Sequence, residues 1–291
     1  MLASPFFVAL VLGAAAAWAQ TTDLLASTIA DLALASRILA QQGVVDAFGH
    51  ISARHPTNSS RFLLSRNLAP AQVTPADVLE YNIADASPVD PNAPNGFIER
   101  FIHSELYKKF GSGDGETQVQ SVVHFHAKEV LPFSVLPERT MPFRAVNHLG
   151  SFLGASPAPN FDIASHFGPS TDMLVRSTTI GASLASLFKP TLPTARTGIN
   201  STVLPFVLMR GHGGTVVGPS IELAVFRSVY TKVTAEVLAQ TAAVAGGLQA
   251  VDFMSAGECE AATATLAAQA TRAFNLWGAE LAGMIPDIVP T

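Results

Sequence analysis

Apolar residues recur along this chain with two periods, one typical of helices and one typical of strands. From Asp23 to Gln42, leucine, isoleucine and alanine return at helical spacing, and Gly43 follows, as expected for an amphipathic helix with a glycine beyond its end. Short apolar segments typical of strands follow at 61–66, 121–126 and 203–209. Further helices are predicted at 96–110, 178–188, 219–245 and 255–283, with a short helix opening at Thr74-Pro75.

Helices and strands alternate from residue 23 to the C-terminal helix, and the sequence shows no internal repeat and no domain linker. Segment 203–209 is apolar on both faces, which indicates a central strand. Segment 189–201 is rich in proline, threonine and glycine and is predicted to be a loop. We therefore predict one layered α/β domain.

The first 20 residues have the pattern of a secretory signal. Phe6 to Ala17 forms a short apolar core, and Ala17-Trp18-Ala19 places small residues at the two positions that a signal peptidase inspects. The apolar core is shorter than the roughly 20 residues that span a bilayer. We therefore expect residues 1–19 to be a signal peptide, residues 20–291 to be the mature domain, and the protein to be secreted or in the lumen of the secretory pathway.

Other features agree with passage through that pathway. Asn58-Ser59-Ser60 and Asn200-Ser201-Thr202 are acceptor sequons, so Asn58 and Asn200 are candidates for N-glycosylation. Cys259 is the single cysteine and cannot close a disulfide within the chain. Stability is therefore expected to depend on the core and on contacts between subunits.

Composition bears on the partners of this protein. Hydrophobic residues make up 48% of the chain and charged residues only 13%, which leaves apolar surface to be buried between subunits. The formal net charge is -5 and lysine and arginine are not clustered, so no nucleic-acid or membrane partner is expected. An oligomer acting on a small molecule fits this composition.

Three histidines and one glutamate carry the candidate chemistry. His124 and His126 alternate along a strand and therefore point to the same side of the sheet. His212 follows another strand among glycines, and Glu99 lies in the helix that precedes the first strand. Each residue alone is commonly structural, but together they supply three nitrogen ligands and a carboxylate, which suit one Zn²⁺, Mn²⁺ or Fe²⁺ ion per chain.

The order of these motifs resembles the class II aldolase/adducin family, over about residues 28–245. The matching motifs are Gly49-His50-Ile51-Ser52-Ala53-Arg54, Glu99-Arg100-Phe101-Ile102-His103, Val123-His124-Phe125-His126 and Arg210-Gly211-His212-Gly213. The resemblance implies a three-layer αβα domain with a central, mostly antiparallel sheet. It also implies a homotetramer with active sites at subunit interfaces. In this pattern His124, His126 and His212 bind the metal ion, for which zinc is the first choice. Glu99 is a ligand or the acid/base group.

Departures from the family bear on the substrate. Sugar-phosphate members carry two small hydroxyl residues before the glutamate, where this chain has Phe97 and Ile98, and an asparagine where it has His50. A phosphate would lose these donors. The motifs resemble more closely the branch that includes decarboxylases of hydroxy-aromatic dicarboxylates. The tyrosines that some aldolases contribute from the chain end find no match here.

Other charged residues are weaker candidates. A substrate carboxylate would need a cation, and the candidates are Arg54, Arg66 and Arg210, each of which could instead be a structural arginine. His50 and His148 either contact substrate or make structural hydrogen bonds. His103, one helical turn after Glu99, is expected behind the ligands, where it could orient them.

The resulting hypothesis is a secreted, divalent-metal-dependent lyase that breaks a C–C bond. Decarboxylation of a small, non-phosphorylated hydroxy, keto or hydroxy-aromatic acid is the leading reaction. The alternatives are a retro-aldolase, a non-haem iron oxygenase, and a non-catalytic, adducin-like binding module.

Overall fold

The computed structural model describes residues 5–111, 119–137, 142–189, 204–247 and 250–284. At its centre lies a seven-stranded sheet in the order β3-β2-β1-β4-β7-β6-β5. The strands are β1 (His50–Arg54), β2 (Arg61–Ser65), β3 (Val78–Asn82), β4 (Ser121–Phe125), β5 (Asn160–Phe161), β6 (Phe206–Met209) and β7 (Gly213–Gly218). All neighbouring strands are antiparallel except the pair β5 and β6, so the predicted mostly antiparallel sheet is confirmed.

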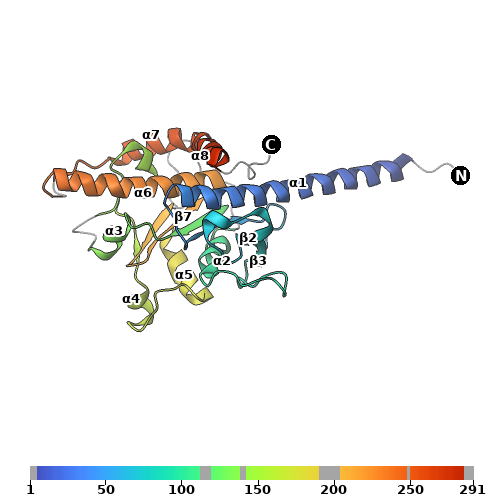
Figure 1. Cartoon of the computed structure of the whole chain (residues 1–291), viewed down its shortest axis with the longest axis horizontal. Coiled ribbons are helices and arrows are strands. Elements are labelled where there is room, and N and C mark those ends of the chain that lie inside the picture. The colour runs from blue at the N-terminus through green and yellow to red at the C-terminus, as the bar shows by residue number, and fades with distance from the viewer. Residues whose placement is uncertain (1–4, 112–118, 138–141, 190–203, 248–249, 285–291) are drawn as a thin grey trace.

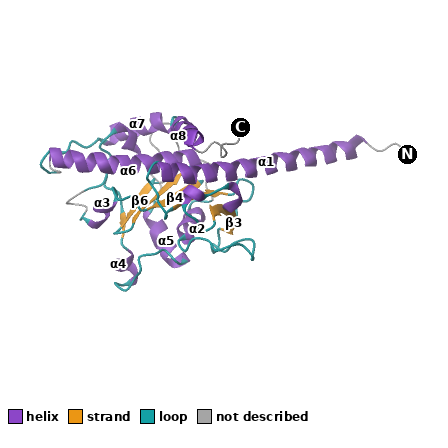
Figure 2. Ribbon diagram, viewed as in Figure 1, coloured by secondary structure: helices purple, strands orange, loops and turns teal. Residues whose placement is uncertain are grey.

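Helices cover both faces of this sheet (Figure 1). One face carries α1 (Pro5–Gln41), α6 (Ile221–Val244), α7 (Ala256–Ala267) and α8 (Ala270–Met284). The other carries α2 (Arg100–Lys109) and α5 (Thr178–Leu187), which pack on each other. The strands lie between these two helical layers, which confirms the predicted αβα architecture (Figure 2).

Short helices occupy the connections between these elements. They are η1 (Pro70–Gln72), η2 (Pro75–Asp77), α3 (Leu131–Val135), η3 (His148–Leu153) and α4 (Ile163–Phe167). The short helix predicted at Thr74-Pro75 is η2, with Thr74 and Asp77 as a reciprocal cap. Among the described residues, no helix is long and apolar enough to cross a membrane.

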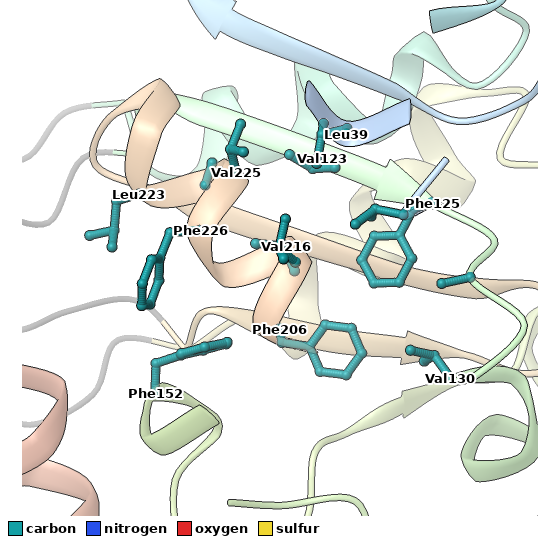
Figure 3. Packing of buried hydrophobic residues seen from close by; sticks show 14 of the residues in the cluster. Leu39, Val123, Phe125, Val130, Phe152, Phe206, Val216, Leu223, Val225 and Phe226 are labelled. Carbon is teal, nitrogen blue, oxygen red and sulfur yellow. The ribbon is translucent and has the colours of Figure 1, made fainter. Parts of the chain in front are cut away.

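Two apolar clusters hold the layers together. On the α1 and α6 side, Val123 and Phe125 of β4 meet Val216 of β7, Phe226 of α6 and Leu39 of α1 (Figure 3). Because side chains alternate along a strand, the neighbouring Val122 faces the opposite cluster with α2 and α5. His124 lies two residues after Val122 on β4, so its side chain points to the same face of the sheet, toward α2.

Two helix predictions need correction. The helix predicted from Asp23 begins at Pro5 instead, so α1 includes part of the proposed signal segment. The single helix predicted at 255–283 is two helices, α7 and α8. No glycine or proline separates them, but α7 packs on η3 whereas α8 packs on α1 and α6. Tertiary contacts therefore divide this segment at a point that the sequence does not mark.

Other elements were predicted with shifted ends or not at all. The helix predicted at 96–110 begins at Arg100, so Glu99 is its N-cap residue. Strand β7 follows the 203–209 strand directly and was not predicted, because its glycine-rich sequence reads as a loop. The loop predicted at 189–201 lies, after its first residue, outside the described residues, as does the sequon residue Asn200.

Candidate metal centre

Four side chains from three segments of the chain converge at the C-terminal end of β4. His124 lies in β4, His126 just beyond its end, His212 in the turn between β6 and β7, and Glu99 at the start of α2. One ligand atom from each of these residues lies within 4.8 Å of every other. The predicted constellation of three histidines and one glutamate is therefore assembled in space.

The shortest distances involve the Nε2 atom of His124. It lies 2.9 Å from Nε2 of His126 and 3.3 Å from Oε2 of Glu99. The same carboxylate oxygen lies 3.5 Å from Nε2 of His212. The imidazole rings of His126 and His212 have their centroids 4.7 Å apart and an interplanar angle of 28°.

Local geometry explains how His212 reaches this point. Strands β6 and β7 pair Met209 with Gly213, so the turn between them is tight. Gly211 and Gly213 both have positive φ, at 64° and 144°. A Cβ atom on Gly213 would lie 2.1 Å from the carbonyl oxygen of Phe125. Glycine is therefore required for the turn to approach β4 and to bring His212 beside His126.

The carboxylate of Glu99 is held in its charged form. Burial disfavours the charge, yet His124 and His212 hold the pKa of Glu99 well below its ordinary value. Its Oε1 accepts a hydrogen bond of 3.0 Å from the backbone N–H of Val175, which leaves Oε2 directed at the imidazoles. The site therefore contains one buried negative charge among histidines.

The histidines are suited to offer lone pairs. Burial first, and then the proximity of His124 and His212, lower the pKa of His126 to about 3. His126 is therefore neutral near pH 7. Nδ1 of His124 lies 3.4 Å from the hydroxyl of Thr215, which leaves Nε2 as the nitrogen facing the cluster.

This donor set fits a divalent metal ion. The Nε2 atoms of His124 and His126, 2.9 Å apart, can share at most one proton, and they lie beside the carboxylate of Glu99, so a cation fits among these donors. Imidazole nitrogens with a carboxylate oxygen are ligands of Zn²⁺, Mn²⁺ and Fe²⁺. His124, His126 and His212 would hold the ion, and Glu99 would be either a fourth ligand or an acid/base group beside it.

Two further histidines lie behind this cluster. His50 and His124 are register partners on β1 and β4, and their ring centroids are 5.3 Å apart. His103 was expected behind the ligands and is fully buried, with its ring nitrogens 2.7 Å from His50 and 2.6 Å from Ser52.

The arginines proposed for substrate binding have other partners. Arg54 is buried and donates to the backbone carbonyls of Val119 and Tyr107. Arg66 pairs with Asp77 at 2.7 Å, and Arg210 pairs with Asp162 at 2.8 Å. The structure brings none of the three into contact with the four donors.

The remaining candidates lie at the surface. His148 is exposed at the start of η3. Asn58 lies in the turn between β1 and β2, where its Oδ1 accepts hydrogen bonds from the backbone and hydroxyl of Ser60. Among the described residues, neither position contacts the four donors.

A cavity lies beside His126. An open cavity of 240 Å³ is lined by His126, Lys128 and Glu129 on one side and by residues 43–46 on the other. Lys128 is exposed at this mouth.

The fold and the cluster of three histidines and one glutamate agree with the protein family that the sequence matches. Residues 30–239 match the Class II Aldolase and Adducin N-terminal domain. The chain belongs to this family.

Individual proteins add to this family match. Decarboxylase tropJ of Talaromyces stipitatus is 43% identical over 203 residues, which are 69% of this chain and 71% of that protein. An aldolase II superfamily protein from Pseudomonas syringae superposes with a TM-score of 0.65 at 18% identity, covering 91% of this chain and 95% of that one. L-fuculose 1-phosphate aldolase from Glaciozyma antarctica PI12 gives 0.62 at 19%, covering 91% and 93%. At such identities the two solved structures establish the fold.

Proposed function

We propose that this protein is a divalent-metal-dependent decarboxylase of a small, non-phosphorylated hydroxy, keto or hydroxy-aromatic acid. Its family and its decarboxylase relative make it a lyase. The observation that carries the proposal is the convergence of Glu99, His124, His126 and His212 within 4.8 Å, in a chain 43% identical to a decarboxylase.

The surroundings of the cluster support a substrate without phosphate. Phe97 is buried against His50, with ring centroids 4.5 Å apart, and Ile98 is exposed beside Glu99. Neither side chain donates a hydrogen bond. An apolar wall next to the donors suits an aromatic or aliphatic acid better than a sugar phosphate.

A bound divalent ion would supply Lewis acidity, which draws electrons from substrate oxygens as charge develops. Glu99 is the base in this proposal: its Oε2 takes the proton of the substrate hydroxyl. The bond to the carboxylate carbon then breaks, CO₂ leaves, and the electron pair remains on the substrate carbon. That carbon takes the proton back from Glu99, so proton and charge balance.

The experiment is CO₂ release from a panel of hydroxy-aromatic and hydroxy or keto acids, with and without added Zn²⁺, Mn²⁺ or Fe²⁺. We expect metal-dependent release that is lost in the His124→Ala/His126→Ala variant and retained in His166→Ala, a surface histidine on α4. Aldehyde or ketone products without CO₂ would favour a retro-aldolase. Oxygen uptake would favour an iron oxygenase.

We also propose zinc as the resident ion, a homotetramer with active sites at subunit interfaces, and secretion after cleavage of residues 1–19. The apolar composition supports assembly. The apolar core before Ala17-Trp18-Ala19 supports the signal peptide. Mass spectrometry of the secreted protein would reveal its N-terminus and any glycan on Asn58 or Asn200.

A further inference from the structure

Four polar side chains form a hydrogen-bonded chain that leads from the metal centre into the core. Nδ1 of His50 lies 2.7 Å from Nε2 of His103. Nδ1 of His103 lies 2.6 Å from the hydroxyl of Ser52, which lies 2.7 Å from the hydroxyl of Tyr107. His50 is 5% exposed and the other three are fully buried. We name these four residues the buried relay.

The backbone fixes the members of the buried relay. His50 and Ser52 alternate along β1 and face the same side, while His103 and Tyr107 are one turn apart on α2. Arg54 donates to the carbonyl of Tyr107 and lies over its ring at 4.9 Å. The relay is therefore held by two rigid elements.

The available donors and acceptors determine which atom donates in each hydrogen bond of the buried relay. Burial raises the pKa of Tyr107 and lowers that of His103 to about 3, so both are neutral near pH 7. Among the described side chains, the Ser52 hydroxyl is the hydrogen-bond partner of the Tyr107 hydroxyl, so the phenol proton is donated to Ser52. Ser52 then donates to Nδ1 of His103.

The position of the proton on the His50 ring follows from this order of donors and acceptors. With Nδ1 accepting from Ser52, His103 carries its proton on Nε2 and donates it to Nδ1 of His50. Neutral His50 must then carry its own proton on Nε2. The opposite order would leave the phenol hydrogen of Tyr107 buried without an acceptor, which is costly.

The Nε2 of His50 is left for a ligand. Among the described residues, no hydrogen-bond partner is recorded for this atom. The ring packs between Phe97 and His124, at centroid distances of 4.5 and 5.3 Å. A substrate oxygen bound near His124 would come within reach of this ring.

We propose that His50 donates an Nε2–H hydrogen bond to an anionic oxygen of the substrate, and that His103, Ser52 and Tyr107 are positioning residues that fix its tautomer. This inference rests on the proposed function for the substrate class, a hydroxy-aromatic or related carboxylate. Because the donor is neutral, it binds the oxygen without adding a second charge beside the metal ligands.

Proton–nitrogen NMR of the zinc-loaded full chain with ¹⁵N-labelled histidine tests the tautomer directly. The His50 signal is assigned by its loss in His50→Gln. We expect Nε2–H in the unmodified protein and a shift of the population toward Nδ1–H in Tyr107→Phe and in Ser52→Ala. Added 2-hydroxybenzoate should move the His50 signal, and its dissociation constant should rise roughly tenfold in Tyr107→Phe.

Tyr81→Phe is the matched control. Tyr81 is as buried as Tyr107 and lies in the same apolar cluster, but its hydroxyl has no hydrogen-bond partner among the described residues. Its variant should leave the His50 tautomer unchanged. Nδ1–H in the unmodified protein, an unchanged tautomer in both relay variants, or no response to 2-hydroxybenzoate would each overturn the proposal.

The NMR readout also separates the two proposals. It requires no turnover, so the predicted tautomer in a protein that releases no CO₂ would reject decarboxylation and leave the buried relay standing. Metal-dependent CO₂ release with His50 in the Nδ1–H form would support decarboxylation and reject the role proposed for the buried relay.

Discussion

Glu99 combines a buried charge with one carboxylate oxygen that faces the histidines. Its Oε1 is fixed by Val175, while Oε2 lies 3.3 Å from His124 and 3.5 Å from His212. A group placed this way can act on a proton as well as on a cation. Its two proposed roles can be separated by substitution.

Glu99→Gln keeps the shape of the side chain and removes its charge. Decarboxylation should fall by roughly 10²- to 10⁴-fold, because the base is lost. The three histidines should still bind metal, so elemental analysis should find an ion in the variant. Glu80→Gln, at a partly exposed pair with Arg61, is the control and should keep its activity. Unchanged CO₂ release in Glu99→Gln would reject the base role.

His103 makes folding stability depend on pH. Burial lowers its folded-state pKa to about 3, below the unfolded value of about 6.5. Its contribution to stability is therefore complete above pH 6.5 and is lost as pH falls from there toward 3, at up to about 1.4 kcal/mol for each pH unit.

Urea unfolding at pH 7 and pH 5 measures this dependence. The unmodified protein should lose more unfolding free energy between these two pH values than His103→Gln does, because glutamine does not titrate. Equal losses in both proteins would mean that His103 is not buried as a neutral group.

Individual residues were predictable where chemistry and spacing coincided. His124, His126, His212 and Glu99 carry ligand atoms in a recognisable order, and the structure brings them together. Ser52 was missed as a functional candidate, because a serine carries no distinctive signal. Its alternation with His50 on β1 was the available clue.

Tyr107 was missed for a related reason. It lies one helical turn after His103, but a tyrosine on an apolar face reads as core. The partners of Arg54 could not be predicted either, because they are backbone carbonyls of distant segments. Such contacts are visible only after the chain has folded.

At the scale of elements, glycines decide how β6 and β7 present His212. Gly213→Ala should destabilise the protein by at least about 2 kcal/mol, because of its positive φ and the close approach to Phe125. It should also lower metal content, since His212 is displaced. Thermal unfolding and elemental analysis measure both effects.

Gly257→Ala is the control within a helix. Gly257 lies in α7, and a Cβ atom added there meets nothing within 4 Å. This variant should keep its metal and gain up to about 1 kcal/mol of stability. Equal behaviour of the two variants would contradict the role given to the turn.

The elements that the sequence predicted were those whose period is clear. The amphipathic end of α1, helix α5 and strand β4 have such periods, and the structure contains them. Strand β7 gains its identity from pairing with β4 and β6 rather than from its glycine-rich sequence. Propensity could not reveal it, because pairing is a tertiary effect.

At the scale of the whole molecule, apolar side chains remain exposed next to the site. Phe48, 67% exposed, lies two residues before His50, and Ile98, 51% exposed, precedes Glu99. Contact between subunits at this edge would cover both. The proposed tetramer therefore predicts that a polar substitution at Phe48 weakens assembly.

Light scattering should give a particle mass of about four chains for the unmodified protein. Phe48→Ser should shift the mass toward smaller species, because an apolar contact is lost. Val244→Ser, 91% exposed at the end of α6, should leave it unchanged. A monomeric unmodified protein would contradict the proposed assembly.

The architecture as a whole was the most predictable feature. Alternating helices and strands indicated a layered domain, and four ordered motifs indicated the family to which the chain belongs. The ends of helices and the division between α7 and α8 were not predictable, because they depend on which surfaces pack together.

The central claim is that His124, His126, His212 and Glu99 bind one catalytic metal ion, and elemental analysis tests it most directly. The protein should be purified without chelator or affinity metal, beside His124→Ala/His126→Ala and the surface control His166→Ala. We predict about one Zn, Mn or Fe per chain in the unmodified protein and the control, and none in the double variant. No metal in any of the three proteins, with no uptake when metal is added back, would contradict the account and favour a non-catalytic binding module.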